Sequence, residues 1–166
     1  MAYYSIFPKK DTTIYSHPDR IKMNTGHDEV LEIVKERGTS DQRYYPSRIL
    51  IQFDNDEIKD IISNKIGSSI FNNGTTKANI ELYSAEHKNL TTTLNVEAFA
   101  VSKSWSEGSG RFTDVPITSN GTSWVYKDND IEKNQWLTGS VITTGLTYGS
   151  SSININELPS GSAMEL

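Results

Sequence analysis

The distribution of apolar and polar residues predicts one strongly buried strand followed by one short helix. The most apolar segment is 48–54, which ends in an acidic cluster, and we predict a central strand there. Isoleucines then recur at helical spacing at positions 58, 61, 62 and 66, so we predict a helix over 56–64. The acidic residues that precede it are suited to cap its amino end.

Shorter segments with a two-residue period predict further strands. Polar and apolar residues alternate over 11–16 and over 77–84, and the longer run 90–102 has apolar residues on both faces. Segment 29–36 is short and rich in β-branched residues, so we predict a strand there in preference to a helix. Beyond Trp105 glycine-rich loops separate weaker strand segments.

These elements predict an all-β fold, a jelly-roll-like β-sandwich with a single short helix near 56–64. We expect residues 1–10 to form an amino-terminal arm, 11–149 the sandwich, and 150–166 a flexible tail or linker rich in Ser and Gly. The side chains that we expect to contribute most to the core are Ile49, Ile51, Phe53, Ile80, Leu82, Leu94, Val96 and Ala98.

The composition of the chain argues against several kinds of site and partner. The chain has 166 residues, a net charge of −5, no cysteine and three scattered histidines, so we expect no disulfide, no metal site and no nucleic-acid partner. No apolar run reaches the roughly 20 residues of a membrane span, and the first residues lack the pattern of a secretory signal. We therefore expect no membrane partner and no export by the Sec pathway.

Carboxylates at Asp54, Asp56, Glu57 and Asp60 could hold calcium or supply the acid pair of a glycosidase. The alternative, which we favour, is that they complement the dipole at the start of the predicted helix. No Gly-x-Ser-x-Gly elbow is present. We expect no catalytic residues, no cofactor and no enzymatic activity.

Aromatic and charged residues of the carboxy-terminal half are the candidate binding residues: Trp105, Glu107, Arg111, Trp124 and Trp136. Tryptophan rings can stack on sugars, or they can close the end of a sandwich with Glu107 bonded to the backbone, which is the interpretation we favour. We also expect Gly108 and Gly110 to adopt positive φ.

Four segments follow one another in an order that resembles the DNRLRE family: Ser47 to Asp54, Ala78 to Tyr83, Val96 to Val101 and Trp105-Ser106-Glu107-Gly108. The resemblance covers about residues 11–126 and implies a sandwich similar to carbohydrate-binding modules. The amino-terminal residues of the chain, from Met1 to Ser16, look most like those of virion structural proteins of large marine and cyanobacterial tailed phages. In the family further strands close the sheet, whereas here only 135–136, 141–142 and 153–155 remain. We therefore expect either that the chain is truncated or that another polypeptide completes the sandwich.

The resemblance implies a non-catalytic virion protein of the neck, tail or capsid surface that docks on other virion proteins and on copies of itself. The alternative is a carbohydrate-binding module that recognises host surface polysaccharide through the three tryptophans.

Overall fold

The computed structural model describes residues 3–67, 80–83, 97–99, 101, 103–130, 133–136 and 163–165, and all structural statements below concern these residues. The chain divides into two compact units. Unit 1 comprises Met1–Lys10 and Ile51–Leu94, and unit 2 comprises Asp11–Leu50 and Asn95–Leu166. Strands β1 and β3 each cross the boundary between them.

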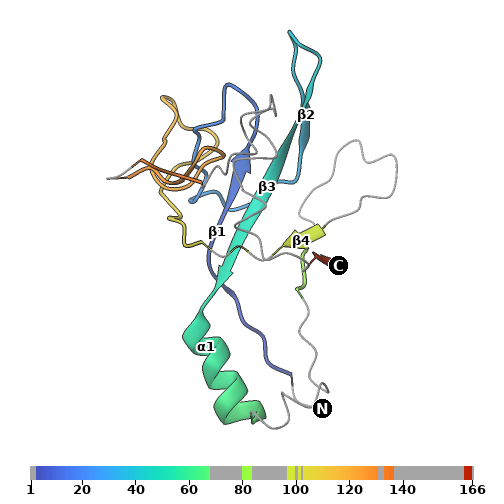
Figure 1. The fold of residues 1–166 in the computed structure, drawn as a ribbon, viewed down its shortest axis with the longest axis vertical. Coiled ribbons are helices and arrows are strands. Elements are labelled where there is room, and N and C mark those ends of the chain that lie inside the picture. Colours follow the sequence, from blue (N-terminus) through green and yellow to red (C-terminus); the bar gives the residue numbers. More distant parts are fainter. Residues whose placement is uncertain are drawn as a thin grey trace. The chain divides into compact units, whose positions relative to one another are not determined.

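The largest sheet has three strands in the order β1-β3-β2 (Figure 1). They are β1 (Pro8–Tyr15), β2 (Lys35–Arg37) and β3 (Tyr44–Phe53). Strand β2 pairs antiparallel with β3, with Lys35 opposite Pro46 and Arg37 opposite Tyr44. The prediction of a central strand at 48–54 is therefore confirmed, as is that of a strand at 11–16, although each begins earlier than expected.

Two further pairs are short. Strand β4 (Glu97–Phe99) pairs with β7 (Ala163–Glu165), and β5 (Tyr126–Asp128) pairs with β6 (Asn134–Gln135), both antiparallel. A short helix, α1 (Asn55–Asp60), continues directly into the wider turns of η1 (Ile61–Ile66). The regular structure of the described residues is thus mostly strand with one short helical segment, which bears out the sheet-rich part of the fold prediction.

The helix begins where the acidic cluster predicts. Asp54 is its N-cap, and the Asp54 carboxylate accepts a hydrogen bond from the Asp56 backbone N–H at 2.8 Å. Lys9 Nζ lies 2.7 Å from Asp54 Oδ2, and this hydrogen bond holds the pKa of Asp54 below its usual range. The capping interpretation of these carboxylates is confirmed for Asp54, and no group of described residues forms a cluster able to hold a metal ion.

Segment 29–36 is not the strand that we predicted, because only its last two residues belong to β2. Side-chain hydroxyls, together with a backbone hydrogen bond from the Ser47 N–H to the Val34 carbonyl at 2.9 Å, hold the rest. The Glu32 N–H donates to Thr13 Oγ1 at 2.9 Å and the Val34 N–H to Ser47 Oγ at 2.8 Å. Ser47 Oγ in turn donates to the Glu32 carbonyl at 2.6 Å.

The core lies in unit 2 and consists of Ile14, Leu50, Trp105, Trp124 and Trp136, with Ile21 and Val101 packed against it. The predicted core differs. Ile49, Ile51 and Phe53 are only half-buried, because Leu50 and Ser47 are the buried residues of β3. Leu82 is 52% exposed, in a segment without regular structure where we predicted a strand, so its core assignment is wrong.

Other predictions fall partly or wholly outside the described residues. Leu94, Val96 and most of the expected tail 150–166 are among these, and the side chain of Ala98 is not described. Of the predicted strand 90–102, residues 97–99 form β4. No described helix has the length and apolar character that crossing a bilayer requires.

Candidate functional site

The three predicted tryptophans lie together in the core of unit 2. Trp105 is 6% exposed, and Trp124 and Trp136 are fully buried. Trp136 Nε1 donates to the Ser123 carbonyl at 2.9 Å, and the Arg48 guanidinium lies over the Trp124 ring at 4.8 Å. Stacking on a sugar requires an exposed ring face, which these three side chains do not offer.

Burial also affects Arg48. Its guanidinium is largely enclosed beside Trp124, and desolvation lowers its pKa from the ordinary arginine value. Because that value is so high, Arg48 stays protonated at neutral pH. The contact with the indole ring therefore pairs a fixed cation with the negative face of a buried aromatic ring.

The two charged candidates, Glu107 and Arg111, are not part of the tryptophan core. Glu107 is half-buried, and its Oε1 accepts a hydrogen bond from the Asp11 N–H at 3.0 Å, which ties the loop to β1. Arg111 is exposed, and its backbone N–H donates to Asp114 Oδ2 at 2.9 Å. The predicted site residues thus do not converge on one cavity: three form the core, one holds a loop and one faces solvent.

Asn24 is a fully buried residue that the sequence analysis did not identify. Its Nδ2 donates to the carbonyls of Glu107 at 2.5 Å and Thr122 at 2.8 Å. Its Oδ1 accepts from the N–H groups of Gly26 at 3.1 Å and Gly110 at 2.9 Å. All four hydrogen-bonding positions of the amide are therefore used to join loops that are distant in sequence.

Glycines make this packing possible. Gly108 has φ +80° and Gly121 has φ +75°, and a Cβ at either position would collide with neighbouring atoms. The expected positive φ is confirmed for Gly108 and wrong for Gly110. Gly110 is required for a different reason, since a Cβ there would meet the backbone of Asn24.

A second polar cluster surrounds Tyr15, whose hydroxyl donates to Glu32 Oε2 at 2.6 Å. Burial, followed by this hydrogen bond, raises the pKa of Tyr15. Burial also raises the pKa of Asp28, which accepts the Phe112 N–H, and the nearby Glu32 adds to that shift. The ring of Phe112 lies between Tyr15 and the Arg20 guanidinium, so these groups brace one another.

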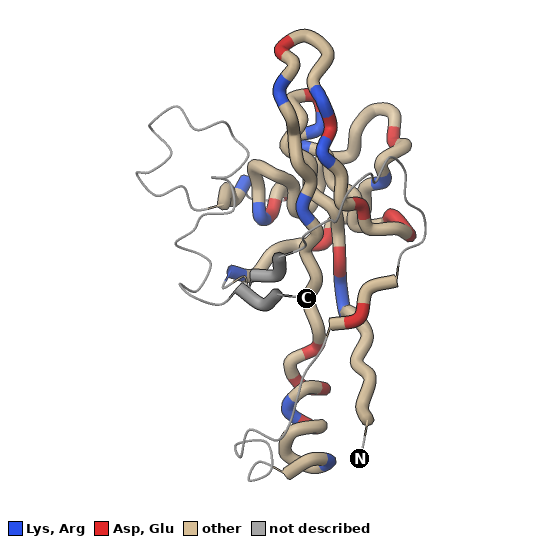
Figure 2. Tube along the Cα trace, turned by 90° about the vertical axis from the view of Figure 1, so that its right-hand side faces the viewer, with Lys and Arg blue, Asp and Glu red and all other residues tan. Residues whose placement is uncertain are grey.

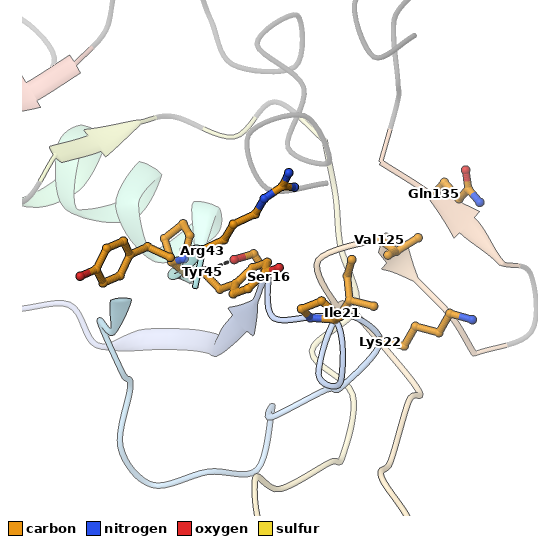
Figure 3. Close-up of a pocket in the computed structure, with 10 residues that line it drawn as sticks. Ser16, Ile21, Lys22, Arg43, Tyr45, Val125 and Gln135 are labelled. Carbon is orange, nitrogen blue, oxygen red and sulfur yellow. Dashed lines mark hydrogen bonds between the residues drawn. The ribbon is translucent and has the colours of Figure 1, made fainter. Parts of the chain in front are cut away.

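Unit 2 also has a pocket of about 540 Å³, which is within the range of small-ligand sites. Its walls are Ser16, Pro18, Ile21, Lys22, Arg43, Tyr44, Tyr45, Pro46, Val125 and Gln135. Figure 3 shows Arg43 and Tyr45 on one side, Lys22, Val125 and Gln135 on the other, and Ser16 and Ile21 between them. The pocket was not predicted from the sequence, although the consecutive residues Arg43-Tyr44-Tyr45-Pro46 supply four of its walls.

Unit 1 has a different character, because none of its described side chains is buried. In the segment before β1, Tyr3 is 85% and Phe7 80% exposed, and the isoleucines of α1 and η1 are at most half-buried. Tyr83 is also exposed. We call Tyr3, Tyr4 and Phe7 the aromatic arm.

Comparison with models of known protein families, with curated proteins and with solved structures found no match to this chain. The resemblance to the DNRLRE family therefore stays a prediction.

Proposed function

We propose that this protein is a non-catalytic structural component of a tailed-phage virion, built as a β-sandwich of jelly-roll type, that docks on neighbouring subunits. The observation that carries the docking part is the exposure of apolar side chains in unit 1. Tyr3, Phe7 and Tyr83 are all at least 80% exposed, while the described part of the unit buries no side chain. Large apolar side chains exposed to this extent favour association.

The arrangement of unit 2 supports a structural role over a catalytic one. The side-chain amide of Asn24, one of the unit's fully buried polar residues, forms hydrogen bonds only with backbone groups. Glu107 is likewise engaged with the backbone of Asp11. Polar groups satisfied in this way hold loops in place.

The virion assignment rests on the residue order that resembles phage members of the DNRLRE family, and its test is direct. Mass spectrometry of purified particles of the phage that encodes the chain should find it in fixed stoichiometry with the major tail or capsid protein. Its absence from particles, with the protein abundant in the infected cell, would overturn the virion assignment. The alternative, a carbohydrate-binding module that uses the three tryptophans, is not supported, because their rings are buried.

A further inference from the structure

We propose that the pocket of unit 2 binds a short extended peptide of a partner protein that carries a carboxylate beside apolar side chains. This inference rests on the proposed docking function and adds the chemistry of one contact. We call the pocket the cationic pocket, after Lys22 and Arg43 in its walls.

Charge is the first argument. The chain is acidic overall, with a net charge of −5, yet the walls of the cationic pocket include two cations and no carboxylate. Among the ion pairs of the described residues, none involves Lys22 or Arg43. Asp41, the nearby carboxylate, accepts hydrogen bonds from the Tyr45 hydroxyl and the Arg43 N–H. Figure 2 shows basic and acidic positions interspersed along the β2–β3 hairpin, whereas the walls of the pocket include basic residues and no acidic one.

The remaining walls decide between a peptide and a sugar. Pro18, Ile21, Pro46 and Val125 give the pocket apolar sides. Two of its three hydroxyl groups are already engaged, because Ser16 Oγ donates to the Pro46 carbonyl at 2.7 Å and Tyr45 donates to Asp41. A sugar would need free polar partners for its hydroxyl groups, whereas an apolar side chain would not.

Two wall residues match the other parts of a peptide. The amide of Gln135, which is exposed, can donate to and accept from a peptide backbone. Tyr44 is 58% exposed, and Lys35 lies over its ring at 5.0 Å. A tyrosine ring beside prolines is a surface on which proline and leucine side chains pack well.

The test is a selection of random hexapeptides displayed on filamentous phage, panned against the immobilised full-length chain at low salt. We expect the enriched sequences to combine Asp or Glu with Leu, Pro or Tyr. Synthetic versions should lose about tenfold or more in affinity when Glu is replaced by Gln in the peptide, or when the chain carries Lys22→Gln together with Arg43→Gln. Raising the salt concentration should also weaken binding.

The matched control is Lys65→Gln with Lys103→Gln, which removes two exposed cations outside the pocket and should leave the affinity unchanged. Unchanged tryptophan fluorescence will show that both double variants are folded. The proposal is wrong if no sequence is enriched, or if the selected peptides bind the Lys22→Gln, Arg43→Gln chain equally well. If the unmodified chain and the control variant bind polygalacturonate but the Lys22→Gln, Arg43→Gln chain does not, the pocket binds an acidic sugar instead of a peptide. None of these results depends on whether the chain is found in particles, so the two proposals fail separately.

Discussion

Asn24 performs a task that backbone ladders perform elsewhere in sheet proteins. Its amide group bonds to four backbone groups, and its own N–H donates to the Thr118 carbonyl at 3.0 Å. Replacing it with alanine would leave two N–H and two carbonyl groups without partners in a buried site. We expect Asn24→Ala to lower the free energy of unfolding by about 3 kcal/mol or more.

Tryptophan fluorescence during urea unfolding measures this change selectively, because all three tryptophans are buried in unit 2. The control is Asn120→Ala, which removes two exposed bonds to Ser109 in the same loop region. It should cost less than about 1 kcal/mol. Equal losses for the two variants would contradict the structural role assigned to Asn24.

A glycine can be required by a positive φ or by a neighbour that leaves no room for a Cβ. Comparison of Gly108 with Gly67 distinguishes these two reasons. Both have positive φ, +80° and +87°, but a Cβ would collide with Asn24 and Asn120 at Gly108 and would meet nothing within 4 Å at Gly67. Gly67→Ala should cost only the backbone strain, about 1–2 kcal/mol. Gly108→Ala should cost clearly more in scanning calorimetry, and a similar cost for both would show that the close packing is incorrect.

Asp11 provides a test that depends on pH. Desolvation, and then the nearby Glu107 carboxylate, raises the pKa of Asp11 in the folded chain. Folding therefore disfavours the ionised form, so this carboxylate reduces stability at pH 7 and ceases to do so below its unfolded pKa, about 3.9. Asp11→Asn should raise the urea midpoint at pH 7 and leave it nearly unchanged at pH 3. A lower midpoint at pH 7 would show that the carboxylate stabilises the fold.

Such residue roles differ in how far they could be predicted. The capping by Asp54 depends on Asp56, two residues away, and was predictable from local sequence. The amide of Asn24 binds partners as far as 98 residues away, and no local pattern marks a residue that joins distant loops. The positive φ of Gly108 followed from its turn sequence, but the need for Gly110 depends on packing against Asn24.

At the scale of elements, hydrophobic pattern predicted β3 and α1 because each depends on its own residues. The pattern failed at 29–34, where the hydroxyls of Thr13 and Ser47 and a backbone bond between Ser47 and Val34 stand in place of a regular strand ladder. It also failed at Leu82, because alternation over 77–84 does not guarantee a neighbouring strand to cover one face. The predicted inward face of β3 was also wrong. Ile49, Leu50 and Ile51 are all apolar, so the sequence does not show that Leu50 is the buried one and that Ile49 and Ile51 are half-buried.

The difference between a buried and an exposed leucine can be tested at Leu50 and Leu82. Leu50 is buried among the core tryptophans, so Leu50→Ala should cost about 2–5 kcal/mol through lost contacts and a cavity. Leu82→Ala, although it removes the same atoms, should change stability by less than about 0.5 kcal/mol because the side chain is largely exposed. Urea unfolding followed by circular dichroism will measure both. A large loss for Leu82→Ala would restore the strand assignment at 77–84.

At the scale of the whole molecule, the two units contrast in their burial. Unit 2 has a core of three tryptophans with Ile14 and Leu50, whereas the described part of unit 1 buries no side chain. The aromatic arm illustrates the consequence, since Tyr3 and Phe7 have only water around most of their surface. Covering them with a partner would remove apolar area from water, which is the main source of association free energy.

We therefore expect the purified chain to associate, and the association to depend on the aromatic arm. Sedimentation velocity should show species larger than a monomer whose proportion rises with concentration, and Tyr3→Ser with Phe7→Ser should shift the distribution toward the monomer. The control is Val115→Ser, which removes an equally exposed apolar side chain, 96% exposed, from unit 2. It should leave the distribution unchanged if the arm is the contact. A chain that sediments as a monomer at all concentrations, or that associates equally well without the two aromatic rings, would show that the arm does not mediate contacts between copies.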